Sequence, residues 1–395
     1  MRSPVPDYLA EVVQTCDLAD GALADYIPEL AQVDPEVAAI ALATVNGAEY
    51  TAADAQVPFT IQSMSKPFVY ALALEDRGVD DVLAHVNVEP SGEAFNEISL
   101  EADTGRPRNP MINAGAIAVH GLVLADSPEQ RSARVRAWFG RLAGRALAVD
   151  EAVYASEWDH AHRNLALGHL LASTGIIAGD PVPVVRGYVE QCSYLVTVRD
   201  LAVMAATLAD GGVNPVTGDV VMSAATARQV LSVMTTCGMY DAAGDWLSTV
   251  GIPAKSGVSG GILGVLPGQV GVAVFSPRLD RHGNSVRGVE MMRRLSQDMG
   301  MHLMNPARPA RSALAGIDVD GDTTTYRLHG DLIFVSTESL LARIEADPPT
   351  TSRVVFDLTA VDELDDVARR MALEAERRLV ADGLEVHIEG LRRSR

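Results

Sequence analysis

Two short apolar runs at opposite ends of a long alanine-rich segment constrain the fold of this chain more than any other feature. Residues 38–45 and 261–275 have the length and apolar character of strands, whereas the sequence between them is mainly helical in its periodicity. Strands from both ends are expected to share one antiparallel sheet, with the helices between them packed on it. This layout predicts a mixed α/β fold and not a βαβ repeat. The clearest expected helices cover residues 68–76, 131–142, 164–173 and 198–209.

A change in composition near residue 305 indicates a second domain, for which a chain of 395 residues is long enough. The passage NPARPARSALAGIDVDGD, at 305–322, is rich in Pro, Arg and Gly and has no sustained period, which is typical of a linker. After it, TTTYRLHG and LIFVS are expected to form two strands around a turn at Gly330 and Asp331. A helix, a strand, a helix and a strand follow, so the expected order is ββαβαβ. We therefore expect a large domain at 1–305, a linker at 306–314 and a small α/β domain at 315–395.

The charge and the cysteine content exclude several classes of function. The chain has 52 acidic and 32 basic residues and a net charge of −20, so it offers no basic field to a nucleic acid backbone. Pro4, Pro6, Asp7 and Glu11 interrupt the apolar core that a signal peptide needs, and no apolar window is long enough to cross a bilayer. Three cysteines without a CxxC pair fit a reducing compartment. We expect a soluble cytoplasmic protein that binds neither nucleic acid nor membrane.

The scarcity of lysine marks two positions. Of the 32 basic residues, only Lys66 and Lys255 are lysines, and all others are arginines. Arginine stays protonated in proteins, whereas a buried lysine can lose its proton and act as a base. Lys66 follows Ser63 by three residues in FTIQSMSKPF, so on a helix the hydroxyl and the amine share one face. Pro67 is compatible with the first turn of such a helix, and free N–H groups there would favour an oxyanion near Ser63.

Lys255 lies in a second motif, Lys255-Ser256-Gly257, at the start of the late strand-like run. An early S-x-x-K on a helix and a late K-[ST]-G on a strand are together typical of the serine acyl-transfer fold of β-lactamases and penicillin-binding proteins. Either motif alone is weak, because a Ser and a Lys three residues apart on a helix are usually solvated neighbours. Since both lysines fall in these motifs, we expect a β-lactamase/transpeptidase-like domain, with an antiparallel sheet and a helical cluster.

Across residues 10–300 the chain resembles the bacterial glutaminase family. The resemblance implies hydrolysis of L-glutamine to L-glutamate and ammonia through a Ser-Lys acyl-enzyme, with no metal and no organic cofactor. It rests on six stretches that follow one another in order: FTIQSMSKPF at 59–68, NPMINAGAI at 109–117, SEWDHAHRNLALGHLL from 156, YVEQCS from 188, CGMYDAAGDW from 237, and GIPAKSGVSGGILGVLPGQVGVAVFSP from 251.

The same resemblance implies roles for individual residues. Ser63 matches the nucleophile, Lys66 matches its general base, and the backbone N–H groups of Ser63 and Val258 match an oxyanion hole. Tyr188 or Tyr240 could relay protons to the leaving ammonia, and Lys255 could lower the pKa of a nearby hydroxyl by its charge. Residues that match the substrate-binding positions of the family are Ser63, Asn113, Glu157, Asn164, Tyr188, Tyr240 and Val258.

The residue types at these positions suit a small zwitterion. Glu157 can pair with an α-ammonium group, while amide and phenol donors can hold an α-carboxylate. Glu157 and Asn164 are seven residues apart, so on a continuous helix they would share one stripe. Outside the resemblance, Asn113 could be a turn residue, and both tyrosines could be core aromatics.

Four other interpretations are weaker. Cys237 could be a thiol nucleophile, but it has no His nearby in sequence, so packing is preferred. Asp159, His160, His162 and His169 could suggest a metal site, yet their spacing is not that of ligands on one helix face. The chain could be a β-lactam-interacting serine acyl transferase, but the S-x-N motif and the export signal expected of that class are not evident in the sequence. A non-catalytic signalling scaffold leaves the two lysines unexplained.

The C-terminal segment resembles the STAS domains, which are similar to anti-sigma-factor antagonists. The resemblance rests on the ββαβαβ order and on the stretch RVVFDLTAVDELDDVA. Many STAS domains carry a phosphorylatable hydroxyl after the loop aspartate; here Asp365 matches the aspartate, and Asp366 replaces the hydroxyl residue. The resemblance therefore implies a docking or assembly module without a phosphorylation switch. We expect a homo-oligomer, a dimer or a homotetramer, with a possible protein partner at this domain.

Overall fold

The chain divides into two units, Met1–Asn305 and Pro306–Arg395, which are described separately. The structure is a computed structural model, and it describes residues 3–16, 20–25, 27–91, 100–305, 313–364 and 366–390. The linker expected at 306–314 lies largely outside the described residues.

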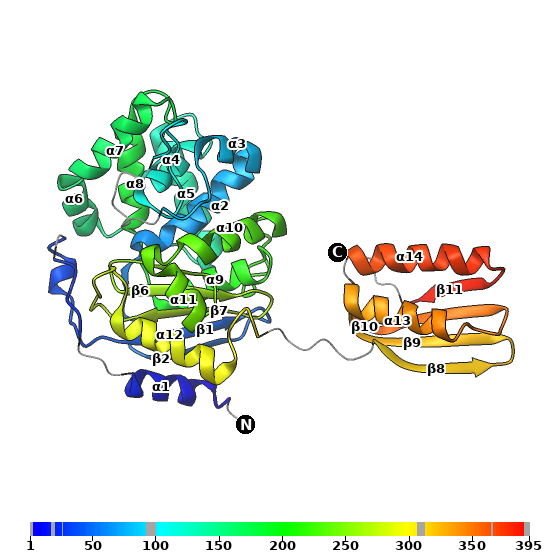
Figure 1. Cartoon of the computed structure of the whole chain (residues 1–395). Helices are drawn as coiled ribbons and strands as arrows, with labels where there is room; N and C mark the ends of the chain where they lie inside the picture. The colour runs from blue at the N-terminus through cyan, green and yellow to red at the C-terminus, as the bar shows by residue number, and fades with distance from the viewer. Residues whose placement is uncertain are drawn as a thin grey trace. The chain divides into compact units, whose positions relative to one another are not determined.

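An antiparallel sheet of five strands forms the centre of the larger unit, with the order β2-β1-β7-β6-β5. Every neighbouring pair is antiparallel, and β1 pairs with β7 from Ala39–Phe275 to Thr44–Val270. The prediction that strands from both ends of the unit share one sheet is confirmed (Figure 1). The strands are β1 (Ala39–Thr44), β2 (Glu49–Ala53), β5 (Ala254–Ser256), β6 (Gly261–Leu266) and β7 (Val270–Phe275).

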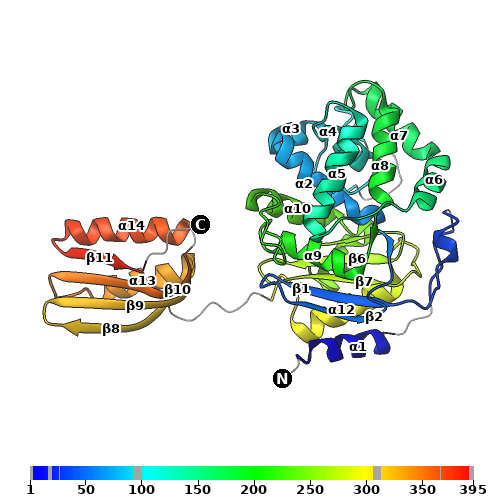
Figure 2. The same cartoon turned by 180° about the vertical axis from the view of Figure 1, so that it is seen from behind.

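Helices cover both faces of this sheet. Helices α1 and α12 pack on one face, and α11 contributes Trp246 to the same hydrophobic cluster. Helix α9 packs on the other face, and helices α2 to α8 form a cluster beyond it (Figures 1 and 2). None of the helices in the described part of the chain is long and apolar enough to span a bilayer. The helices are α1 (Val5–Thr15), α2 (Lys66–Arg77), α3 (Val79–His85), α4 (Asn113–Leu122), α5 (Pro128–Ala143), α6 (Glu151–Asp159), α7 (His162–Ser173), α8 (Pro181–Cys192), α9 (Val198–Ala209), α10 (Ala224–Cys237), α11 (Ala243–Thr249) and α12 (Val286–Met299).

Helix α9 lies unusually close to strand β7 because both contribute small residues. A Cβ added at Gly271 would lie 2.2 Å from the Ala206 nitrogen and 2.4 Å from the Ala202 carbonyl oxygen. The helix begins at a capping box, in which the Thr197 side chain accepts from the Asp200 N–H and the Asp200 carboxylate accepts from the Thr197 N–H. Because its N-terminus is capped and its side chains are small, α9 can pack directly on the sheet and support the helical cluster beyond it.

The smaller unit is a four-stranded mixed sheet with the order β11-β10-β9-β8 and with helices α13 and α14. Strand β8 pairs antiparallel with β9, whereas β9, β10 and β11 are parallel. The expected order ββαβαβ is confirmed. The elements are β8 (Leu314–Asp320), β9 (Thr323–Leu332), α13 (Phe334–Ala346), β10 (Arg353–Leu364), α14 (Asp366–Ala381) and β11 (Glu385–Glu389). Asp365 lies outside the described residues, and Asp366 begins α14.

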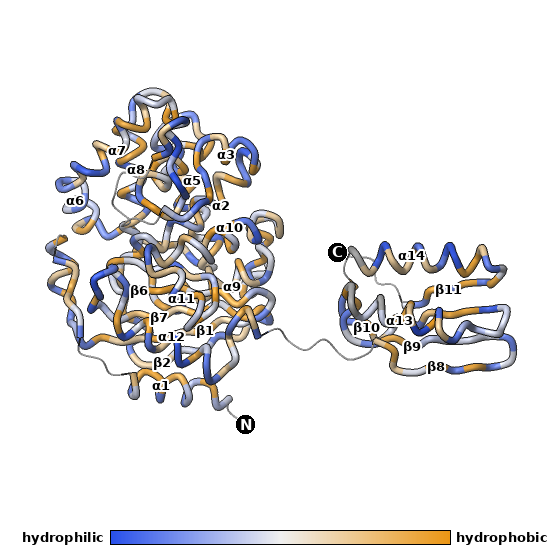
Figure 3. The backbone as a smooth tube through the Cα atoms, in the orientation of Figure 1, coloured by the Kyte–Doolittle hydropathy of each residue, from blue (hydrophilic) through white to orange (hydrophobic). Residues whose placement is uncertain are grey.

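The expected positions of the first two strands in this unit were wrong. The first strand is β8, inside the passage interpreted as linker, and its turn to β9 is at Gly321 rather than Gly330. Strand β9 runs through Gly330, and the stretch FVS belongs to α13. An isolated apolar run of five residues does not distinguish a strand from the start of a helix, which explains the error. Helix α14 is easier to recognise than these short strands, because hydrophilic and hydrophobic residues alternate along it (Figure 3).

Candidate active site

Ser63 lies in a single 3-10 turn, Gln62–Ser65, that leads directly into α2. The preceding short strand β3 (Phe59–Thr60) pairs with β4 (Leu195–Val196), and the Ile61 N–H donates to the Tyr194 carbonyl oxygen at 2.8 Å. Pro67 occupies the first turn of α2, where its missing N–H leaves no helical bond unmade. The helix expected to start near Ser63 therefore starts three residues later. Ser63 itself is only 8% exposed.

Gln62, immediately before the serine, is a site residue that the sequence did not reveal. Its φ is +50°, and it is one of three non-glycine residues with positive φ in the described ranges, the others being Ala53 and Tyr240. Its Nε2 donates to Glu157 Oε1 at 2.6 Å and to Thr60 Oγ1 at 3.2 Å. Backbone strain of this kind concentrates at functional sites. The sequence gives no distinct signal for Gln62, because Thr60, Ser63 and Ser65 in the same stretch are polar as well.

Asn113 connects three of the expected residues. Its Oδ1 accepts from Lys66 Nζ at 2.7 Å and from the Tyr188 hydroxyl at 3.1 Å. Its Nδ2 donates to Asn164 Oδ1 at 3.3 Å. Asn113 is the first residue of α4, so a helix start positions the amide, and Asn113 is not merely a turn residue.

Burial changes the acid–base character of Lys66. The side chain is 1% exposed, and burial lowers the pKa of its amine to about 8, while the nearby Cys192 and Glu157 oppose that shift. No carboxylate forms an ion pair with Lys66 in the described part of the chain. A lysine in this environment is neutral often enough to accept a proton.

Lys255 is fully buried on strand β5, opposite Leu263 on β6. Its Nζ donates to the Ser256 carbonyl oxygen at 2.9 Å and lies 3.9 Å from the centre of the Tyr240 ring. Burial lowers the pKa of Lys255 well below its usual value, and the nearby Lys66 lowers it further. Two close buried amines resist carrying two protons, and the role expected for Lys255, to lower the pKa of a nearby hydroxyl by its charge, stays a prediction.

The two tyrosines differ in their contacts with the serine. Tyr240, in the 3-10 turn Tyr240–Ala242, has a φ of +56° and donates to the Ser256 carbonyl oxygen at 3.4 Å. Burial raises the pKa of its phenol to about 12, although hydrogen bonding with Ser63 and Ser256 opposes the rise. Tyr188 instead bonds to Asn113, and burial raises its pKa as well. Both phenols therefore remain protonated donors near neutral pH, and Tyr240 is the one that contacts the serine.

The turn that follows β5 brings Gly257, which precedes Val258, against the serine turn. A Cβ added at Gly257 would lie 3.2 Å from the Ile61 carbonyl oxygen and 3.3 Å from Gln62 Cβ, so the two backbones pack closely. Within the described residues, neither the Ser63 N–H nor the Val258 N–H donates to a protein acceptor. Two free donors on adjoining backbones are the arrangement that an oxyanion hole needs.

Glu157, in α6, accepts from the same Gln62 Nε2 as Thr60. Glu157 and Asn164 do not share the one stripe that a continuous helix would give them, because α6 ends at Asp159 and α7 begins at His162. Desolvation raises the pKa of Glu157 to about 7, although the hydrogen bond from Gln62 opposes the rise. An ammonium group placed beside this carboxylate would restore its ionised form.

Two alternative sites receive no support from the geometry. Cys237 is 4% exposed within the main hydrophobic cluster, and burial raises the pKa of its thiol, so it is a core residue. Among the residues that the structure describes, no group of three or more His, Cys, Asp or Glu side chains is placed to hold a metal ion.

Comparisons with known proteins agree on one family. The family model described as Glutaminase matches residues 21–304. A glutaminase of Corynebacterium glutamicum is 50% identical over 391 residues, which cover 98% of this chain and 94% of that protein. A solved structure described as Mglu in its glutamate form is 46% identical, with a TM-score of 0.91 and full coverage of both chains. A solved probable glutaminase, ybaS, is 40% identical with a TM-score of 0.73, and the match covers 76% of this chain and 99% of that chain.

Proposed function

The chain belongs to the glutaminase family, and on that premise we propose that its serine site hydrolyses L-glutamine to L-glutamate and ammonia. The enzyme is an amidohydrolase. The full-length structural neighbour in a glutamate form supports a site that accommodates the amino-acid product. The grouping of Ser63, Lys66 and Asn113 supports chemistry at a carboxamide.

The proposed first half-reaction forms an acyl-enzyme. The Ser63 hydroxyl oxygen attacks the side-chain carboxamide carbon while the neutral Lys66 amine takes the hydroxyl proton. The negative charge that develops on the carboxamide oxygen is held by the free N–H groups of Ser63 and Val258. The carbon–nitrogen bond then breaks, and the leaving nitrogen receives a proton through the Tyr240 hydroxyl, which contacts the serine.

The second half-reaction releases the product. A water molecule gives a proton to the same base and attacks the ester carbonyl carbon, with the charge again held by the two backbone N–H groups. The bond to the Ser63 oxygen breaks, that oxygen regains its proton, and L-glutamate leaves. Each proton taken up in acylation or deacylation is returned, so the enzyme ends unchanged.

Substrate orientation follows from the residues around the serine turn. Glu157 pairs with the α-ammonium group of the substrate, because its carboxylate is held near the serine turn by the hydrogen bond from Gln62. Amide and phenol donors from Asn113, Asn164 and Tyr188 hold the α-carboxylate. Discrimination against shorter amides then depends on the distance between these groups and Ser63.

The observation that carries the proposal is the buried Lys66, with its lowered pKa and no ion-pair partner in the described residues. We expect Ser63→Ala to abolish ammonia release and Lys66→Arg, which keeps the charge but not the basicity, to be nearly as damaging. A coupled glutamate assay with glutamine, asparagine and γ-glutamyl amides measures both effects. Ser65→Ala, in the same turn, is the matched control and should retain activity.

Two outcomes would contradict this mechanism. If Lys66→Arg kept most of the activity, Lys66 would not be the base. If Ser65→Ala were as inactive as Ser63→Ala, the loss would come from a disturbed turn. Labelled penicillin is the further control, since acylation by a β-lactam without ammonia release would favour the other serine acyl transferases.

The C-terminal unit supports a separate proposal, namely a STAS-like docking or assembly module. The order of its strands and helices and its mixed sheet are the supporting observations. Asp366 is the first residue of α14, and an aspartate cannot be phosphorylated as a serine would be. Assembly through this unit would give a dimer or a tetramer. Three unpaired cysteines support a cytoplasmic location.

A further inference from the structure

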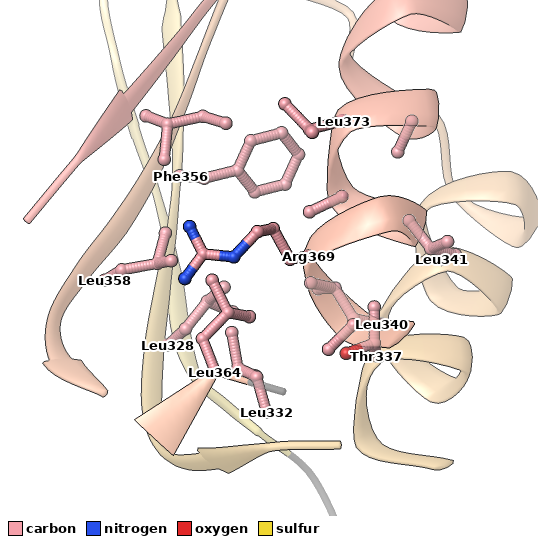
Figure 4. Close-up of a pocket in the computed structure, with 14 residues that line it drawn as sticks. Leu328, Leu332, Thr337, Leu340, Leu341, Phe356, Leu358, Leu364, Arg369 and Leu373 are labelled. Atoms are coloured by element: carbon pink, nitrogen blue, oxygen red, sulfur yellow. The ribbon is translucent and has the colours of Figure 1, made fainter. Parts of the chain in front are cut away.

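An apolar cavity of about 110 Å³ lies inside the C-terminal unit, between its sheet and helices α13 and α14 (Figure 4). Leucine and phenylalanine side chains form most of its wall. Leu373, which is 46% exposed, also lines the cavity, so the cavity reaches the surface along α14. Apolar cavities of roughly this size, about 150 Å³ in one engineered case, stay dry and bind small apolar molecules. The wall is contributed by Leu328, Leu332, Leu340, Leu341, Phe356, Leu358, Leu364, Leu373 and Ile388.

Two polar groups in this cavity have no partner. The Arg369 guanidinium extends from α14 toward Leu358 and Leu328 on the sheet (Figure 4), and it forms no hydrogen bond or ion pair within the described residues. Thr337 Oγ1, from α13, is buried and unbonded, in a side chain that is only 3% exposed. A buried hydroxyl without a partner is unfavourable, and a guanidinium without an anionic partner can pair with one, so both groups are suited to a ligand.

The identity of the two groups limits the ligand. A guanidinium presents a planar fork that matches a carboxylate, and the Thr337 hydroxyl adds a neutral donor in the same cavity. A single cation balances a single negative charge, which disfavours a phosphate dianion. The remaining wall offers only hydrocarbon, which disfavours a polar amino acid such as glutamate.

We propose that this cavity binds a monocarboxylate with an unbranched hydrocarbon tail, such as a medium-chain fatty acid. The carboxylate pairs with Arg369, and the tail lies among the leucines between the sheet and the two helices. The site is in a different unit from the serine site and does not depend on the activity proposed for that site. Each methylene that enters the cavity is expected to tighten Kd about fourfold, until the cavity is full.

Calorimetric titration of the full chain with hexanoate, octanoate and decanoate tests the proposal, with 1-octanol as the uncharged probe of equal length. We expect affinity to rise with chain length and octanoate to bind at least about tenfold more tightly than 1-octanol, because only octanoate has a charge for Arg369. Absence of binding at millimolar concentrations would overturn the proposal, and so would equal affinity for the acid and the alcohol.

Variants locate the binding. Arg369→Met keeps the apolar volume and removes the charge, so it should abolish the preference for octanoate over 1-octanol. Arg377→Met removes an exposed arginine of the same helix and should leave that preference intact. Ala372→Trp fills the cavity and should abolish binding of both probes. Far-UV circular dichroism and thermal melting verify that the smaller unit of each variant is folded, and unchanged octanoate binding in Arg369→Met or Ala372→Trp would place the ligand elsewhere.

Discussion

At the scale of single residues, burial shifts the pKa values of two site residues toward neutral pH, one from above and one from below. Burial disfavours charge, so it lowers the pKa of Lys66 to about 8 and raises that of Glu157 to about 7. Catalysis as proposed needs the amine neutral and the carboxylate ionised. Both requirements are met only on the alkaline side of these values, where the two groups are deprotonated.

The pH dependence of kcat/KM follows from these two values. Below about pH 7 both groups are protonated in the free enzyme, so log kcat/KM should rise with a slope near two. Between about pH 7 and 8 only Lys66 still has to lose its proton, and the slope should fall to one. In Glu157→Gln we expect kcat/KM to be lower at every pH, and log kcat/KM to rise with a slope of one over the whole range below about pH 8. A slope of two that persists in Glu157→Gln would show that another acid titrates there.

Residue identity was easier to infer from the sequence than residue contact. The scarcity of lysine pointed to Lys66 and Lys255, and in the structure Lys66 contacts Asn113 and Lys255 contacts the Tyr240 ring. Gln62 was missed because its bond to Glu157 depends on a backbone φ of +50°, which no residue pattern specifies. The tyrosine in contact with Ser63 was likewise undecidable, since it depends on how two distant turns pack.

At the scale of elements, long periodic segments were predicted better than short apolar ones. Helix α9 was expected at residues 198–209 and has those bounds, because its capping residues and its periodicity agree. The first strand of the C-terminal unit was missed because alternating residues in AGIDVDGD are too polar to suggest a sheet. Strand β8 is largely exposed, so burial did not select hydrophobic residues along it.

The start of α4 offers a test of how elements position the site. A Cβ at Gly115 would lie 1.9 Å from the Asn109 carbonyl oxygen, so Gly115→Ala must move the helix start that carries Asn113. We expect a loss of about 1–3 kcal/mol in the free energy of unfolding and a fall of about 100-fold in kcat/KM. Urea denaturation and the coupled assay measure the two effects.

Gly244→Ala is the matched control for this test. Gly244 is also helical, in α11, and has no atom within 4 Å of an added Cβ. This variant should therefore be active and at least as stable as the unmodified chain. Equal behaviour of the two variants would show that the backbone contact at Asn109 does not position Asn113.

At the scale of the whole molecule, the larger unit contains every residue of the candidate site, and its clusters of buried residues are separate from that of the smaller unit. Removal of residues 306–395 should leave kcat and KM for glutamine unchanged. It should lower the number of subunits per particle, obtained from the mass measured by light scattering, or abolish binding of a protein partner. The match to the shorter ybaS structure, which leaves about a quarter of this chain uncovered, supports an independent larger unit.

The outcome of the truncation distinguishes two relationships between the units. Lost activity in a truncated chain that keeps its helical circular dichroism would mean that the smaller unit contributes to catalysis. Unchanged activity together with an unchanged number of subunits would leave assembly to the larger unit alone.

The pairing of β1 with β7 also has a consequence for synthesis on the ribosome. Strand β1 can pair with β2 as soon as that hairpin emerges, but its other edge has no partner until residue 275 has been made. At typical elongation rates of about 5–20 residues per second, that edge waits on the order of 10–45 s. An unpaired, apolar strand edge is a template for intermolecular association during this interval. A nascent chain released before β7 is therefore expected to aggregate, whereas one released after β7 already contains its complete central sheet.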